Sequence, residues 1–249
     1  MEIALGFAIA AVIGLTGVGG GSITTPVLFL VMGVPTAEAV GISLLFAAVV
    51  KLASAPIFMA RGHVHWRTVG MMLTTGLPGV LLGALLLRGM EPALMNAFVG
   101  LTIVSIAVIN MFRLSPNGRH ERAGLLVGLS FIIGLEMGFS SAGAGALGAL
   151  MMMSLTTLEP AELVGTNLFY GLLLSVVGGG IHASAGNMDA GLLTMLLLGG
   201  VPGALIGSYL SAKLPVKKYR VALSLLLIFL GGQLAWDGLS AGMQFGFIR

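Results

Sequence analysis

The chain has 249 residues, of which 57% are hydrophobic and only 8% are charged, whereas a soluble domain averages about 25% charged residues. Most of its surface must therefore face lipid, which predicts an all-α polytopic membrane protein. The formal net charge of +3 does not indicate a nucleic-acid partner, because the basic residues lie in short loops and form no patch that could follow a phosphate backbone. The chain contains no cysteine, which excludes disulfides, thiol catalysis and cysteine metal sites.

Several apolar stretches reach the roughly 20 residues that a membrane-spanning helix needs. They are residues 37–60, 67–88, 92–112, 161–184, 190–212 and 220–240. Two further stretches, 3–33 and 125–155, are too long for one crossing and too short for two. Small residues interrupt both, at 14–22 and 138–145, and glycine costs about 1 kcal/mol relative to alanine inside a helix. We therefore expect a helix break in the middle of each. The first residues carry no positive charge of the kind typical of a cleaved signal peptide.

The sequence contains a long internal repeat. Residues 14–88 match residues 138–212 at a constant shift of 124. The clearest match aligns Gly76-Leu77-Pro78-Gly79-x-x-x-Gly83 with Gly200-Val201-Pro202-Gly203-x-x-x-Gly207, and we expect these glycines to permit close helix packing. A duplicated membrane unit is typical of secondary transporters, whose substrate binds where the halves meet. The predicted domains are a first transmembrane repeat at 1–112, a cytoplasmic linker at 113–122 and a second transmembrane repeat at 123–249.

The basic residues favour one of two topologies. If 3–33 and 125–155 fold back as re-entrant hairpins, one side of the membrane receives Arg61, Arg67, Arg113, Arg119, Arg122, Lys213, Lys217, Lys218 and Arg220. Only Arg88 and Arg249 lie opposite. Because basic loops stay in the cytoplasm, we predict two inverted repeats, each a broken hairpin plus three transmembrane helices, with both termini outside. Eight full crossings, which divide the basic residues almost evenly, remain the alternative.

The two predicted breaks are the leading candidates for a substrate site. A helix broken inside a membrane frees backbone N–H and C=O groups, which is tolerated only in a protein-lined or wet cavity. The N–H groups at a helix start favour an anion. The candidate residues are Gly19, Gly20, Gly21 and Ser22 in the first repeat, and Ser140, Ser141, Gly143 and Gly145 in the second. The alternative is that the glycines only allow close packing.

Three polar residues within the spans are further candidates. Lys51 lies deep in a span, where a charge costs several kcal/mol unless it faces a cavity or a partner. It could neutralise an anionic substrate or form a structural pair with Glu136, and its repeat equivalent is Ser175. Ser43 and Asn167 occupy equivalent positions and could reach substrate oxygens, or could form interhelical hydrogen bonds.

Other ionisable residues have weaker patterns. Glu38 and Glu162 begin predicted spans, and 159–162 is typical of a helix cap. His182, near the end of its span, is the histidine best placed to handle a proton.

The quoted residues resemble those of a known family. Gly17-Val18-Gly19-Gly20-Gly21-Ser22-x-x-x-Pro26-Val27-Leu28, then Ala39-Val40-Gly41-Ile42-Ser43-Leu44, with Val164-Gly165-Thr166-Asn167-Leu168 in the second half, resemble the sulfite exporter TauE/SafE family over about residues 5–240. The resemblance implies a secondary transporter that exports sulfite or organosulfonates such as sulfoacetate by alternating access across the bacterial cytoplasmic (inner) membrane. The second copy departs from the pattern, with Ala142-Gly143-Ala144-Gly145 in place of a triple glycine.

The expected partners follow from this interpretation. They are a small anionic substrate and the lipid bilayer, with no nucleic acid and no cofactor, and a homodimer is left open. No nucleotide-binding or catalytic motif is present in the sequence, so we expect a transporter and not an enzyme. The alternative function is a transporter or channel for another small anion, or for a metal ion or other cation.

Overall fold

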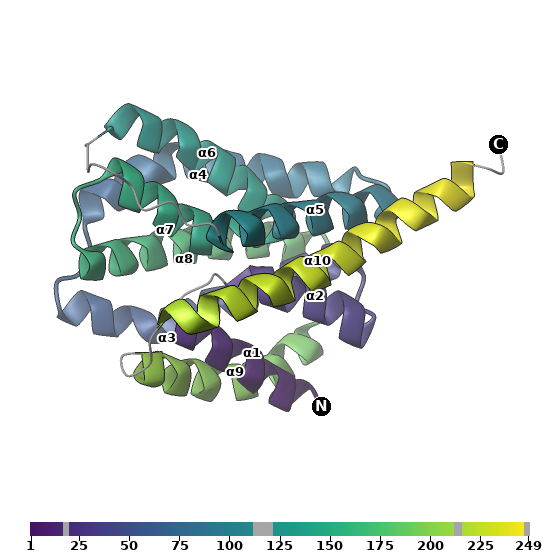
Figure 1. Cartoon of the computed structure of the whole chain (residues 1–249), viewed down its shortest axis with the longest axis horizontal. Coiled ribbons are helices and arrows are strands. Elements are labelled where there is room, and N and C mark those ends of the chain that lie inside the picture. The colour runs from purple at the N-terminus through teal and green to yellow at the C-terminus, as the bar shows by residue number, and fades with distance from the viewer. Residues whose placement is uncertain (17–19, 112–121, 212–215, 247–249) are drawn as a thin grey trace.

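The computed structural model describes residues 1–16, 20–111, 122–211 and 216–246 (Figure 1). Within these residues every regular element is an α-helix, as the composition predicts. The helices are α1 (Glu2–Thr16), α2 (Gly20–Met32), α3 (Thr36–Ala60), α4 (Trp66–Arg88), α5 (Pro92–Met111), α6 (Ala123–Ser140), α7 (Gly143–Leu155), α8 (Pro160–Ser184), α9 (Ala190–Ser211) and α10 (Val216–Gly246).

Among the described residues, seven helices are long and apolar enough to cross a membrane. Six of them, α3, α4, α5, α8, α9 and α10, match the predicted spans. The seventh is α6, which has 18 residues and forms the first half of the stretch that the sequence analysis did not count as a span.

The structure corrects the prediction for the last span. We expected a loop at 213–220, but α10 already begins at Val216 and has 31 residues. A helix of this length extends about 46 Å, whereas the hydrocarbon core is about 30 Å thick, so the helix continues beyond it. Figure 1 shows the C-terminal end of α10 projecting past the other helices.

Both stretches are broken where the glycine clusters predict. α6 ends at Ser140 and α7 begins at Gly143, while α1 and α2 flank residues 17–19. The second stretch folds back, because the Arg122 N–H at the start of α6 donates to the Leu155 carbonyl at the end of α7, at 3.2 Å. The chain therefore leaves this hairpin at the end where it entered. The 13 residues of α7 extend only about 20 Å, too short to cross the core alone.

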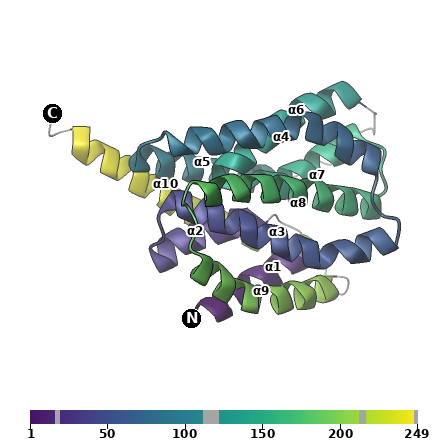
Figure 2. The same cartoon turned by 180° about the vertical axis from the view of Figure 1, so that it is seen from behind.

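The first stretch folds back in the same way. Figures 1 and 2 show that α1 and α3, the helices before and after α2 in the sequence, run in the same direction. α2 runs antiparallel to α3: Gly20 at its start lies against Ala47, whereas Thr25 bonds to Ser43, which comes earlier in α3. α1 and α2 thus form a second hairpin.

The directions of α4 and α8 decide between the two topologies. The Arg88 guanidinium at the end of α4 donates to the Ile181 carbonyl at 3.2 Å and the Ser184 hydroxyl at 3.4 Å, both at the end of α8. The two helices therefore end on the same side. Eight successive crossings would make them antiparallel, so this alternative is wrong.

Each hairpin packs on the opposite repeat: α1 lies along α9, and α6 lies along α4. The last two glycines of each Gly-x-Pro-Gly-x-x-x-Gly segment make these contacts directly on backbone, as predicted, whereas the first glycine lies against the ring of Tyr170 or Phe46. An added Cβ would lie 2.3 Å from Phe131 O at Gly79, 2.0 Å from Leu135 O at Gly83, 2.4 Å from Phe7 O at Gly203, and 2.3 Å from Ala11 O at Gly207. Adding 124 to the glycine numbers of the first two contacts and subtracting 124 from their partners gives the last two contacts. The two hairpins are therefore held by equivalent contacts.

Candidate functional site

The two helix breaks touch each other inside the protein. A Cβ added to Gly21, at the start of α2, would lie 2.0 Å from the Ser141 carbonyl oxygen and 2.2 Å from the Ser141 hydroxyl oxygen. Gly21 belongs to the first hairpin and Ser141 to the turn between α6 and α7. Only glycine allows this approach, because Cβ atoms essentially never come within 3.0 Å of such neighbours. The candidate residues at positions 21 and 141 are thus brought together.

A chain of buried hydroxyl groups surrounds this contact. The Thr25 hydroxyl donates to the Ser43 hydroxyl oxygen at 2.9 Å, and Thr25 and Ser141 lie 2.7 Å apart. Because Thr25 has a single hydroxyl proton, Ser141 donates to Thr25 when Thr25 donates to Ser43. All three side chains are buried, and the chain joins α2, α3 and the α6–α7 turn. Neither hairpin nor α3 can move without changing it.

Ser141 has an unusual backbone. Its φ of 67° is the only positive φ of a non-glycine residue in the described part of the chain. The left-handed conformation costs about 1 kcal/mol for an L-residue, and glycine is the usual choice at this position after a helix. Ser141 caps α6 by donating its N–H to the Met137 carbonyl at 2.9 Å. The cost is offset here by the cap and by the hydroxyl contact to Thr25.

Ser140 and Glu136 form a separate group on the last turn of α6. The Ser140 hydroxyl donates to Glu136 Oε1, and the Ala142 N–H donates to the Ser140 oxygen at 3.3 Å. The second carboxylate oxygen, Oε2, is buried and has no hydrogen-bond partner among the residues that the structure describes. Ser140 therefore connects a partly buried carboxylate to the turn that precedes the N-terminus of α7 at Gly143.

The equivalent residues Ser43 and Asn167 both form interhelical hydrogen bonds, the second of the two roles considered for them. Asn167 Nδ2 on α8 donates to the Gly145 carbonyl on α7 at 3.0 Å, as Ser43 on α3 accepts from Thr25 on α2. Asn167 Oδ1 is buried and has no hydrogen-bond partner in the described part of the protein. Each residue ties the second half of a hairpin to the first full-length span that follows it.

Lys51 is bound to its own repeat equivalent. Its Nζ donates to the Ser175 hydroxyl oxygen at 3.2 Å, and the Ser175 hydroxyl donates to the Gly171 carbonyl at 2.6 Å. The expected alternative partner, Glu136, is not in contact: among the described residues no carboxylate lies within ion-pair distance of Lys51. Ser43 precedes Lys51 by eight residues in α3, about 12 Å along the helix axis.

The remaining candidates lie close to these groups or outside the described residues. Gly20 begins α2, and Ser22 is fully buried in its first turn. Gly19 falls in the segment 17–19, outside the described residues. Thr25 was missed, because its repeat equivalent is Ala149 and the repeat comparison hides it. The only sequence signal was a pair of hydroxyl residues, Thr24-Thr25, within an apolar helix.

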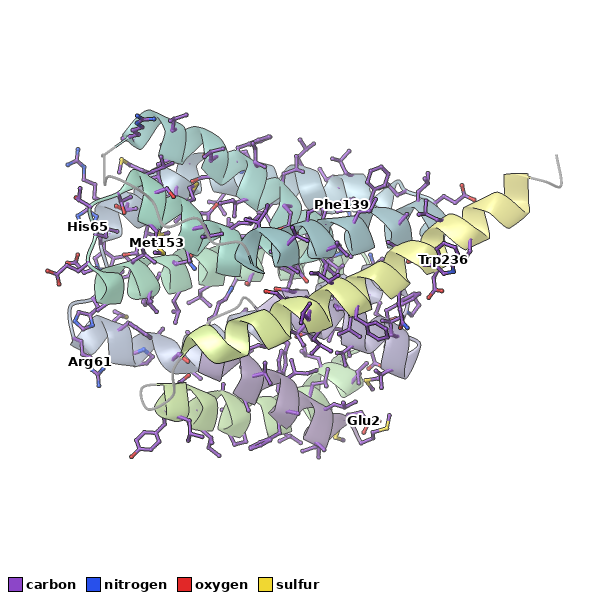
Figure 3. All side chains as sticks on the ribbon, in the orientation of Figure 1. Glu2, Arg61, His65, Phe139, Met153 and Trp236 are labelled. Carbon is purple, nitrogen blue, oxygen red and sulfur yellow. The ribbon has the colours of Figure 1, made fainter. Side chains whose placement is uncertain are left out.

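Other predictions concern the ends of helices. Glu159 and Glu162 form a reciprocal capping box at the start of α8, as predicted. Figure 3 places Arg61 and His65 at the end of the helical body opposite to Glu2. A surface hollow lined by six residues of α10, among them Trp236, contains none of the candidate residues.

These features define a multi-pass helical membrane protein with two broken hairpins that meet in its interior. The model of the sulfite exporter TauE/SafE family matches residues 2–234, so the chain belongs to this family of membrane transporters. It is 29% identical over 248 residues to the probable membrane transporter protein YjnA of Bacillus subtilis, covering 92% of this chain and 96% of that protein.

Two further relatives carry similar names. The probable membrane transporter protein YunE of B. subtilis is 23% identical over 265 residues, covering 95% of this chain and 97% of the relative. A probable membrane transporter protein of Haemophilus influenzae is 27% identical over 229 residues, covering 85% of this chain and 83% of the relative. No solved structure matches the chain significantly.

Proposed function

We propose that this transporter exports small sulfur-containing anions, sulfite or organosulfonates such as sulfoacetate, across the bacterial cytoplasmic membrane. The observation that carries the proposal is the contact of the two breaks at Gly21 and Ser141. It brings the N-terminus of α2 beside the turn that leads into α7.

The chemistry of this region suits an oxyanion. Helix N-termini present N–H donors and a partial positive charge, and the hydroxyls of Thr25, Ser43 and Ser141 are further donors. Sulfite and sulfonate oxygens accept hydrogen bonds from both kinds of group. An anion entering this site would replace the hydrogen bonds that the hydroxyls now form with one another.

Lys51 supplies the positive charge along the route. It is half-buried, has no carboxylate partner in the described residues and lies where equivalent residues of the two repeats meet. Because it lies about 12 Å from Ser43 along α3, we assign it to attracting the anion through the protein and not to holding it at the breaks.

The packing supports alternating access. Each hairpin rests on the opposite repeat through glycine-to-backbone contacts, and the hairpin tips touch each other. A shift of one hairpin therefore changes the surroundings of the other. The exchange of contact partners under the 124-residue shift is what a two-fold axis in the membrane plane would produce. We accordingly propose inverted repeats, with loops 61–67 and 113–122 and the segment 213–220 in the cytoplasm.

Transport by the purified protein in liposomes tests the proposal. Proteoliposomes preloaded with labelled sulfite or ethanesulfonate should release the label faster than protein-free liposomes. Unlabelled anion outside should accelerate the release of label by exchange. The movement of labelled chloride and labelled sodium is measured in parallel, as the alternative substrates. If no sulfur oxyanion moves under any imposed gradient, while another solute does, the proposed substrate class is wrong.

A further inference from the structure

Glu136 is a partly buried carboxylate that neither the helix packing nor the proposed anion contacts require. It lies one turn before the break in α6, and its Oε1 accepts a hydrogen bond from Ser140. Its Oε2 is buried and has no hydrogen-bond partner within the described ranges of the chain. The equivalent position in the first hairpin is Val12, so an apolar residue fills the same place in the repeat.

The helices around α6 provide no charge that neutralises Glu136. α2, α5 and α7 carry no titratable side chain over their described lengths. On α4 and α8 the titratable residues are Arg67, Arg88, Glu162, Tyr170 and His182. None of them forms an ion pair with the carboxylate in the described part of the chain.

Two of these residues contact α6, at other atoms. The Tyr170 hydroxyl donates to the Ser130 carbonyl at 3.0 Å, and His182 Nε2–H donates to the Gly138 carbonyl at 3.1 Å. Arg67 is exposed near the start of α4, Arg88 binds the end of α8, and Glu162 belongs to the capping box. A carboxylate that is buried and unpaired in a membrane segment is costly in its charged form and commonly marks a proton pathway.

The hydrogen bonds connect this carboxylate to the transport site. Ser140 donates to Glu136 and accepts from the Ala142 N–H, in the turn whose next residue begins α7. We propose that Glu136 binds the coupling proton, so that one proton accompanies each anion. This inference rests on the proposed function, because it assigns the coupling ion of the same site.

Like-charge repulsion supplies the coupling. An anion bound by an N–H of the turn and an ionised Glu136 would be separated by roughly 9 Å, three hydrogen-bond lengths. Two unit charges at this distance weaken binding about 20-fold at an effective dielectric constant of 20. The anion therefore binds better when Glu136 is protonated, and by linkage the anion promotes protonation to the same extent.

The charges balance in each transport step. A proton from the solution binds the Glu136 carboxylate as a monovalent anion enters, and both leave on the other side. No net charge crosses the membrane. Transport of a sulfonate then follows the sum of its concentration gradient and the pH gradient and not the membrane potential. Export therefore proceeds when the anion gradient from inside to outside exceeds the opposing pH gradient.

The test uses ethanesulfonate, whose charge does not change in the neutral range, so that only the protein titrates. Wild-type proteoliposomes receive either a pH gradient or a potassium-diffusion potential. We expect about tenfold accumulation per pH unit, as one coupled proton requires, and no response to potential. In Glu136→Gln the two responses should be exchanged. The pH gradient should no longer drive accumulation, because no proton moves with the anion, and the diffusion potential should now drive it.

Two matched variants keep the test specific. Glu162→Gln makes the same change in the capping box, where either residue is accepted, and should behave as wild type. His182→Gln removes the histidine that bonds to α6 at Gly138 and should keep the proton-linked flux. The assignment is overturned if Glu136→Gln still carries protons, or if His182→Gln alone abolishes them.

The wild type gives an answer of its own. If Glu136→Gln does not fold, net charge movement with ethanesulfonate by the wild type would still refute the inference. Sulfonate transport without proton coupling would leave the proposed function unchanged and would refute only the proton-binding role of Glu136. Absence of any sulfonate transport removes both.

Discussion

Lys51 and Ser175 occupy equivalent positions in the two repeats and are hydrogen-bonded to each other, Nζ to Oγ, at 3.2 Å. A residue that contacts its own equivalent must lie where the two repeats meet. The repeats differ there, because one copy has a cation and the other a hydroxyl. The Lys51 charge thus lies between the two repeats and is not duplicated.

Replacing Lys51 with methionine should weaken anion binding without unfolding the protein. Removing a positive charge about 12 Å from the anion corresponds to about 1.4 kcal/mol at an effective dielectric constant of 20, or an increase of about tenfold in the sulfite Kd. Stability should hold or rise, because a charge that is costly at bilayer depth is removed. Arginine should restore only part of the affinity, because its planar fork needs more space than an ammonium group.

Binding and thermal unfolding in detergent measure these two effects separately. Arg61→Met, at an exposed position at the end of α3, is the control and should leave both unchanged. A Lys51→Met protein that transports at the normal rate would show that Lys51 is structural. Unfolding would contradict the observed geometry, in which no buried carboxylate depends on Lys51.

Gly21→Ala should destabilise the protein through the contact between the breaks. The new methyl group would lie 2.0 Å from the Ser141 carbonyl, and overpacking of this kind costs about 1–3 kcal/mol. Gly128→Ala is the matched control, since nothing lies within 4 Å of its added Cβ, and it should gain up to about 1 kcal/mol from helix propensity. Thermal unfolding of both variants compares them directly. Equal stability would mean that the breaks are not in contact.

Much of the architecture could be predicted because the responsible residues recur at a fixed shift. The breaks follow from glycine clusters, and close packing along α4 and α9 follows from glycines that recur in register, although the helices packed against them were not predicted. The hairpin topology followed from the positions of basic residues. Each of these signals is local or repeated, so it can be read without knowing tertiary contacts.

The side-chain partners could not be predicted in the same way. Thr25 contacts Ser141 across 116 residues, and its equivalent, Ala149, has no hydroxyl. Glu136 was considered as a partner of Lys51 because both are ionisable residues at depth, yet Glu136 binds Ser140 within its own helix. Partner choice depends on how helices rotate against one another, and a nearly uniform apolar sequence carries little information about that rotation.

Thr25→Val should separate the role of the hydroxyl chain from that of packing, because valine has nearly the same shape. The buried hydroxyls of Ser43 and Ser141 would lose their shared partner, at a cost of about 1–3 kcal/mol. Anion affinity should also fall if Thr25 contributes a donor to the site. Thr74→Val is the control: Thr74 is exposed and bonds only within its own helix, so its change should stay within about 0.5 kcal/mol. A Thr25→Val protein with normal stability and normal Kd would contradict the assigned hydroxyl chain.

Cysteine labelling from outside the cell tests the proposed orientation in the membrane, in a background that contains no native cysteine. Gly89→Cys and Ala190→Cys lie at exposed positions in the α4–α5 loop and at the start of α9. Both should react with an impermeant thiol reagent, because the contact of Arg88 with Ser184 holds the ends of α4 and α8 on one side. Arg61→Cys lies at an exposed position after the C-terminal end of α3. It should react only after the membrane is permeabilised, since basic loops remain in the cytoplasm. Full labelling of all three after permeabilisation is the control for accessibility.

Reaction of position 61 but not 89 and 190 in intact cells would invert the proposed orientation and leave the fold unchanged. Reaction of only one of positions 89 and 190 would require an odd number of crossings between them, and would refute the hairpin formed by α6 and α7.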